Sequence, residues 1–202
     1  MRTFFAPLAV LCCVTAASFP HGSCLAESDS SSPKQSIDSR EAILLDASPT
    51  ALFQQVRTWV SAALEMSITH EIQFEAVADL AEYAGVDLPT DGNERGIFIE
   101  GEKGWQIFVR EGLPTPLLLE VIAHELAHAW QAGNCPGLQR IDLKEGFAQW
   151  VACQLLKELG FSKEYTALEA RDDFYGESYR LVRDLEKGHG RDGLIKILKE
   201  ID

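Results

Sequence analysis

The segment from Pro116 to Gln131 limits the fold more than any other part of the chain, because a helix with this sequence has to be buried nearly all round. Apolar residues occupy almost every position of the segment. Glu120, His124 and His128 follow one another at four-residue spacing, and Glu125 and Gln131 are the other polar exceptions. Residues four apart lie on one face of a helix. The pattern therefore predicts a buried helix that carries a narrow polar stripe.

Within this helix, His124-Glu125-Leu126-Ala127-His128 has the spacing H-E-x-x-H. Two imidazoles one turn apart can bind one cation, and neutral imidazole nitrogens suit Zn²⁺. Glu125 lies close to the same face, where it could take a proton from water at the metal. We therefore expect His124 and His128 to be zinc ligands and Glu125 to be the general base. The alternative, an ordinary polar helix surface, is disfavoured by the apolar neighbours.

A catalytic zinc site uses a third protein ligand, and Glu145 is the best candidate. It lies seventeen residues after His128, near the start of a second predicted helix from about residue 143 to 159. A competing role exists, because Asp142 to Glu145 also has the spacing of a capping box. In that role Glu145 would only bond the start of its own helix.

Two neighbours of Glu145 bear on the same site. Gly146 lacks a side chain where the two helices are expected to approach closely. Gln149 follows Glu145 by one turn and could orient a metal ligand, or it could lie at the surface.

The other periodicities predict a helix-dominated α+β domain with a small mixed sheet of three or four strands. A helix should begin at Ser48-Pro49, where serine can cap and proline suits the first position. A strand is expected near residues 70–75 and a β-hairpin over residues 96–110. The chain after residue 162 reads as helical, with an interruption at Gly188–Gly190. The domain should span residues 49–202.

The second hairpin strand, Trp105 to Arg110, comes just before the polar-striped helix. As an edge strand it could pair with an extended peptide, main chain to main chain. It could equally be an ordinary strand inside the sheet.

The N-terminus predicts export. Residues 1–26 combine Arg2, an apolar stretch and small residues before a plausible cut after Ala26, which is typical of a signal peptide. A buried helix is the less favoured alternative, and a lipid anchor on Cys24 ranks second. Residues 27–48 are Ser-rich and read as a flexible linker. We expect a periplasmic or secreted protein without a membrane span.

Removal of such a signal would leave two cysteines, Cys135 and Cys153. In an oxidising compartment they could form a disulfide, which we favour slightly over two free thiols.

The chain is acidic, with 18 Lys and Arg against 31 Asp and Glu, for a net charge of −13. Nucleic acids and anionic membranes require clustered positive charge, so neither is expected as the main partner.

The run H-E-L-A-H, followed by Glu145-Gly-Phe-Ala-Gln, resembles the gluzincin peptidases, whose third zinc ligand is a Glu on the helix after the motif. The stretch from Gly112 to Trp130, with Tyr175–Arg180 and Gly193-Leu194, is similar to the C-terminal peptidase domain of plant ubiquitin-activated LIM-domain peptidases. The resemblance covers roughly residues 65–202. It implies a compact zincin-like fold, zinc, and hydrolysis of peptide bonds with Glu125 as general base.

This chain lacks the LIM and ubiquitin-binding segments of the plant proteins, so ubiquitin activation is not carried over. The resemblance makes Tyr175, Tyr179 and His189 candidates for a donor to the oxyanion. None of the three is preferred by the sequence.

These features predict a single-domain zinc metallopeptidase that acts on a peptide or protein substrate. The alternative is a zinc-containing binding module of the cell envelope without proteolysis. A structural zinc site usually closes all four positions with protein ligands and has no use for Glu125, which disfavours that alternative. Substrate, cleavage specificity and oligomeric state are left open by the sequence.

Overall fold

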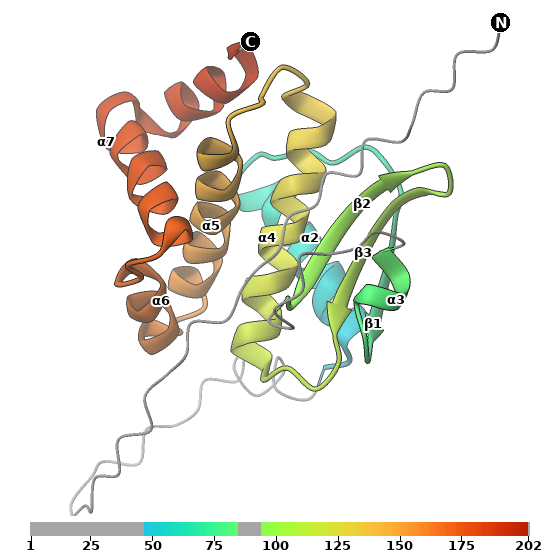
Figure 1. The fold of residues 1–202 in the computed structure, drawn as a ribbon. Coiled ribbons are helices and arrows are strands. Elements are labelled where there is room, and N and C mark those ends of the chain that lie inside the picture. Colours follow the sequence, from blue (N-terminus) through green and yellow to red (C-terminus); the bar gives the residue numbers. More distant parts are fainter. Residues whose placement is uncertain (1–46, 85–93, 202) are drawn as a thin grey trace, which may run out of the picture.

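The computed structural model describes residues 47–84 and 94–201 (Figure 1). The predicted signal peptide, the lipid-anchor candidate Cys24 and almost all of the predicted linker lie outside these ranges. In chain order the elements are α2 (Pro49–Ala63), β1 (Ile72–Val77), α3 (Ala81–Ala84), β2 (Gly96–Gly101), β3 (Gly104–Arg110), α4 (Thr115–Asn134), α5 (Ile141–Glu158), α6 (Ser162–Glu169) and α7 (Phe174–Glu200). The helix-dominated α+β class is confirmed. No helix in the two ranges has the length and hydrophobicity needed to cross a bilayer.

The three strands form one mixed sheet in the order β1-β3-β2. β1 pairs with β3 in parallel, and β2 pairs with β3 in antiparallel fashion through the predicted hairpin. β3 is therefore the central strand, and the prediction that Trp105 to Arg110 could serve as an edge strand is wrong. β1 takes up the side of β3 that the hairpin leaves open. Among the described residues, β1 and β2 are the edge strands.

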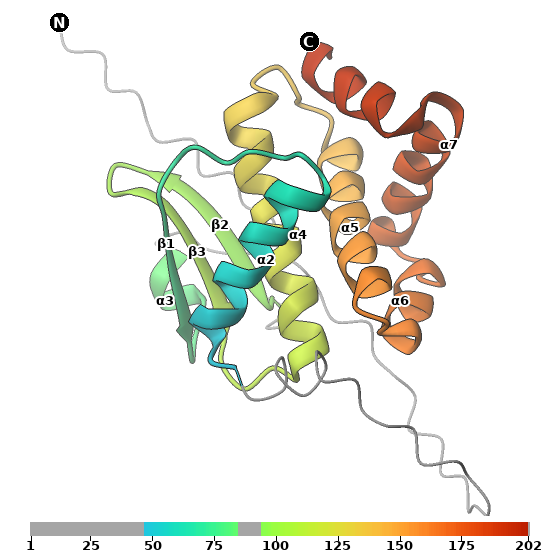
Figure 2. The same ribbon diagram turned by 180° about the vertical axis from the view of Figure 1, so that it is seen from behind.

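The long helix α4 lies at the centre of the molecule, between the sheet and the layer formed by α5, α6 and α7 (Figures 1 and 2). Helix α2 packs beside α4 on the same side of the sheet, where Phe53 stacks on Phe74 of β1 with ring centroids 4.5 Å apart. On the opposite side of the sheet, the described residues form a small apolar cluster of Val77, Leu80, Ile97 and Phe108. The main core thus surrounds α4.

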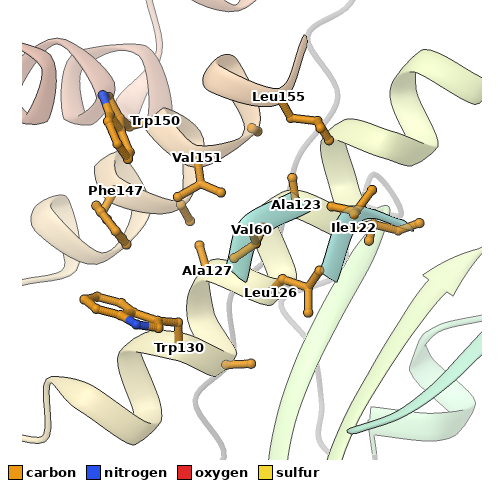
Figure 3. Close-up of a cluster of buried hydrophobic side chains, with 14 of the residues drawn as sticks. Val60, Ile122, Ala123, Leu126, Ala127, Trp130, Phe147, Trp150, Val151 and Leu155 are labelled. Carbon is orange, nitrogen blue, oxygen red and sulfur yellow. The ribbon is translucent and has the colours of Figure 1, made fainter. Parts of the chain in front are cut away.

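Helix α5 runs back along α4 after a connection of six residues, 135–140 (Figure 1). Such a short connection makes consecutive helices antiparallel neighbours. Apolar side chains fill much of their interface: the Phe147 ring of α5 lies 5.3 Å from the Trp130 ring of α4, and Ala123 and Ala127 keep the backbones close (Figure 3). Burying each large apolar side chain contributes about 1.5–3 kcal/mol. This interface fixes the register of the two helices.

Two helix boundaries follow the sequence closely. Ser48 caps α2 by accepting a hydrogen bond from the Ala51 N–H at 3.3 Å, and Pro49 occupies the first turn. The predicted interruption after residue 187 is a kink in α7 at Gly190, whose φ of 70° lies in the left-handed region. Both predictions are confirmed.

The predicted disulfide is wrong: Cys135 and Cys153 are buried free thiols. Cys135 caps the end of α4, whereas Cys153 lies twelve residues after Ile141, the first residue of α5. At 1.5 Å per residue that is about 18 Å along the helix axis. The antiparallel arrangement thus carries the two sulfurs apart, and burial raises the pKa of Cys135 to about 11.

Gly146 lies at a close helix contact, but the partner is α7 rather than the predicted α4. A Cβ atom at this position would lie 2.1 Å from the carbonyl oxygen of Ser178 and 2.9 Å from Val182. Backbone at that distance cannot give way as a flexible side chain can. The glycine therefore lets α7 pack onto the first turns of α5.

We expect Gly146→Ala to destabilise the protein by about 3 kcal/mol, because the added methyl group forces α7 away from α5. Gly188→Ala is the matched control, since a Cβ there meets nothing within 4 Å. That change should be neutral or stabilise by about 0.5–1 kcal/mol. Unfolding in guanidinium chloride measures both. Equal stability of the two variants would contradict the proposed contact.

Candidate metal centre

The two histidines of α4 and the glutamate of α5 meet in the buried interface between these helices. His124 Nε2 lies 3.3 Å and His128 Nε2 lies 3.7 Å from Glu145 Oε2. One potential ligand atom from each residue lies within 4.8 Å of the other two. The three residues are at most 3% exposed. This buried His-His-Glu group can hold a metal ion.

The surroundings of the candidate ligand atoms suit a bound cation better than they suit hydrogen bonds among the protein's own side chains. Within the described residues, His124 Nε2 and Glu145 Oε2 are buried and have no hydrogen-bond partner. An unsatisfied buried polar group costs about 1–3 kcal/mol. Two atoms bound about 2.1 Å from one tetrahedral ion lie about 3.4 Å apart, close to the separations seen here. The unpartnered atoms are therefore placed as metal ligands would be.

The pKa shifts of these groups favour the protonation states that bind metal. Burial lowers the pKa of His124 to about 4, against the opposing effect of Glu145. Burial alone would raise the pKa of Glu145, but His128 and His124 outweigh it and hold that pKa well below its usual value. A neutral imidazole and an ionised carboxylate are both ready to bind a cation at neutral pH.

The start of α5 excludes the capping role for Glu145. The helix begins at Ile141 with Arg140 as the N-cap residue. The Asp142 carboxylate binds the Arg140 guanidinium and accepts a hydrogen bond from the Leu143 N–H at 3.0 Å. Asp142 therefore lies inside the helix, not at the cap, and the Glu145 carboxylate turns toward His124 instead. The capping-box alternative is wrong.

Gln131 orients His128, which the sequence did not predict. The Gln131 side-chain NH₂ donates to the Lys144 carbonyl oxygen at 3.0 Å, so its Oε1 faces His128 Nδ1 at 2.9 Å. An amide oxygen can only accept, so the imidazole proton belongs on Nδ1 and the lone pair on Nε2. That lone pair faces Glu145. The Gln131 amide thus sets the tautomer of His128 and links this histidine to Lys144, the residue before Glu145.

Glu125 is fully buried, and neither of its carboxylate oxygens has a hydrogen-bond partner among the described residues. Burial raises the pKa of Glu125 to about 8. His128 and the Phe98 backbone N–H act in the opposite direction, and Glu145 adds to the rise. A Cβ on Gly96 of β2 would lie 3.0 Å from Glu125 Oε1 and 2.4 Å from Val121. The absence of that Cβ leaves room for the carboxylate between α4 and β2.

The three candidate oxyanion donors fall in different places. The Tyr175 ring lies 6.4 Å from the His124 ring, with the Arg171 guanidinium 4.9 Å from the tyrosine ring. The Tyr179 hydroxyl donates to Glu169 at 3.1 Å. His189 is exposed at the end of the first part of α7. Tyr175 is the one candidate of the three that lies against the His-His-Glu group.

Gln149 is fully buried, so the alternative that it lies at the surface is wrong, and neither of its side-chain polar atoms has a hydrogen-bond partner among the described residues. Burial raises the pKa of Glu120 to about 7, and Arg95, Arg171 and Gln149 act in the opposite direction. Gln149 thus lies near Glu120, the first member of the polar stripe on α4.

No protein-family model, curated protein or solved structure matches this chain. The likeness to gluzincin peptidases therefore depends on the motif and the other sequence stretches described above.

Replacing Gln131 with Ala should weaken binding of a divalent metal ion about 10- to 100-fold, because His128 loses the partner that fixes its tautomer and ring orientation. Competition with a chromophoric chelator measures the affinity, and circular dichroism checks the fold. Asn134→Ala is the matched control, since Asn134 donates to the Trp130 carbonyl at the same end of α4. An unchanged metal affinity in Gln131→Ala would refute the positioning role.

Proposed function

We propose that this chain is a zinc-dependent peptidase of the gluzincin type with a zincin-like fold. The observation that carries the proposal is the buried His124, His128 and Glu145 group with a further buried carboxylate, Glu125, beside it. A site that only stabilised the fold would have no use for this second acidic group.

Zinc is the metal that this ligand set favours. Two imidazoles and one carboxylate form a usual three-residue set for catalytic zinc, which leaves one position open. When bound, a zinc ion supplies a Lewis acid that polarises the scissile carbonyl and lowers the pKa of water to about 7.

Glu125 is the general base in this proposal. Its carboxylate takes a proton from the attacking water and later returns it to the nitrogen of the leaving amine. Gly96 leaves the space in which the carboxylate reaches the water, and the burial of Glu125 keeps bulk solvent from competing for it. Tyr175, beside His124, is the best-placed donor to the developing oxyanion.

Strand β2 supports a peptide as the substrate. It is an edge strand of the described sheet and lies along α4 next to Glu125. An extended peptide could add to that edge by main-chain hydrogen bonds. The net charge of −13 argues against nucleic acid as the substrate. With residues 1–26 as an export signal, the peptidase would act in the periplasm or outside the cell.

We expect Glu125→Gln to retain zinc and to lower the rate of peptide cleavage about a thousandfold, because the amide cannot accept the proton. The readouts are zinc content and digestion of a mixed peptide library followed by mass spectrometry. Glu102→Gln, in the exposed turn between β2 and β3, is the control and should keep full activity.

Cleavage by Glu125→Gln at the parental rate would refute the mechanism. Zinc binding without any cleavage by the unaltered protein would instead favour the binding module of the cell envelope.

A further inference from the structure

Arg171 lies in the connection between α6 and α7, where both its side chain and its backbone are tied down. The residue is 8% exposed. Its Nε donates to the two carboxylate oxygens of Asp173 at 3.0 and 3.1 Å, and its Nη2 donates to one of them as well. The Arg171 carbonyl oxygen accepts a hydrogen bond from the Arg180 guanidinium at 2.6 Å. The guanidinium of Arg171 is therefore held in a fixed place.

The start of α7 is built on the same corner. The Asp173 side chain caps this helix by accepting a hydrogen bond from the Gly176 N–H at 3.0 Å. A Cβ atom on Gly176 would lie 2.1 Å from the Arg171 carbonyl oxygen, so the first turn of α7 packs directly on the backbone of Arg171. One carboxylate thus fixes both the guanidinium and the helix start that carries Tyr175.

The Tyr175 ring connects Arg171 to the candidate metal centre. The guanidinium carbon of Arg171 lies 4.9 Å from the centroid of this ring, and the His124 ring lies 6.4 Å from it. The Phe174 ring meets the Tyr175 ring at an angle of 74°, with the centroids 5.7 Å apart. Contacts on several sides restrict the rotamers that the tyrosine can adopt.

The ion pair between Arg171 and Asp173 would be enough to fix the corner, and it requires no aromatic neighbour. A cation over the face of a phenol ring does more, because it draws electron density from the oxygen and makes the O–H a stronger donor. Arg183 lies 5.8 Å from the Tyr179 ring in a similar way, but the Tyr179 hydroxyl donates to Glu169. Tyr175 is the tyrosine beside His124.

We infer that Arg171 is a positioning residue, which holds the Tyr175 ring beside His124 and strengthens the Tyr175 hydroxyl as a donor to the oxyanion. The inference rests on the proposed peptidase function and adds a residue that acts only through Tyr175. Because the oxyanion forms in the transition state, the contribution of Arg171 belongs in kcat and not in KM.

A double-mutant cycle of Arg171→Met and Tyr175→Phe tests this role on a peptide that the unaltered protein cleaves in the library. Methionine keeps an unbranched side chain but removes the charge. Tyr175→Phe removes the donor and should lower kcat about 100-fold. Arg171→Met should lower kcat about tenfold at unchanged KM. When Tyr175 is already Phe, the same change should lower kcat by less than about twofold.

A phosphonate analogue of the same peptide gives a readout without turnover, because its phosphonyl oxygens mimic the oxyanion. Its affinity for the zinc-loaded proteins is measured by calorimetry. Arg171→Met should weaken binding about tenfold, and this loss should disappear in the Tyr175→Phe background. Zinc content should be the same in all four proteins.

Asp173→Asn keeps the role testable if Arg171→Met folds poorly. Asparagine caps a helix about as well as aspartate, but it cannot form the ion pair that fixes the guanidinium. We expect kcat to fall about threefold, and only while Tyr175 is present. Arg183→Met is the matched control, since it removes a guanidinium from over the Tyr179 ring, and it should keep full kcat.

An equal loss of kcat with and without the Tyr175 hydroxyl, or a loss confined to KM, would overturn the positioning role and leave the peptidase proposal intact. Failure of the unaltered protein to cleave any peptide would overturn the peptidase proposal, and the role of Arg171 would fall with it.

Discussion

The packing of α5 against α4 is the constraint on which the candidate site depends. Phe147 of α5 contacts Trp130 of α4 across the interface, and small residues such as Ala127 let the backbones come close (Figure 3). In that register Glu145 faces the two histidines. On the far side of α5, Gly146 admits α7, which brings Tyr175 to the same place.

Buried polar atoms without a hydrogen-bond partner among the described residues lie at this interface and on the neighbouring side of α4 that faces β2. Unpartnered nitrogens and oxygens of His124, Glu125 and Glu145 are buried among alanine, leucine and aromatic side chains. Each such group costs about 1–3 kcal/mol when it is left unsatisfied. Proteins tolerate such strain mainly at functional sites. A cation between the three ligand residues would convert most of this loss into binding energy, which links metal uptake to stability.

The parts that the sequence predicted are those determined by local periodicity. The buried helix with its polar stripe, the hairpin and the candidacy of Glu145 needed only spacing and amphipathicity. The central position of β3 was missed, because the parallel pairing with β1 joins segments that are distant in the sequence. The link from Gln131 to the Lys144 carbonyl depends on the turn between α4 and α5. In the sequence, the one sign of this link was that a polar residue, Gln131, follows His128 by three positions.

The central claim is that His124, His128 and Glu145 form one metal site, and metal analysis tests it most directly. The purified protein and its Glu145→Ala variant are exposed to zinc, dialysed and assayed for bound metal. The account predicts about one zinc per chain in the unaltered protein and a loss of zinc in the variant. Absence of zinc from the unaltered protein, or its retention in Glu145→Ala, would contradict the account.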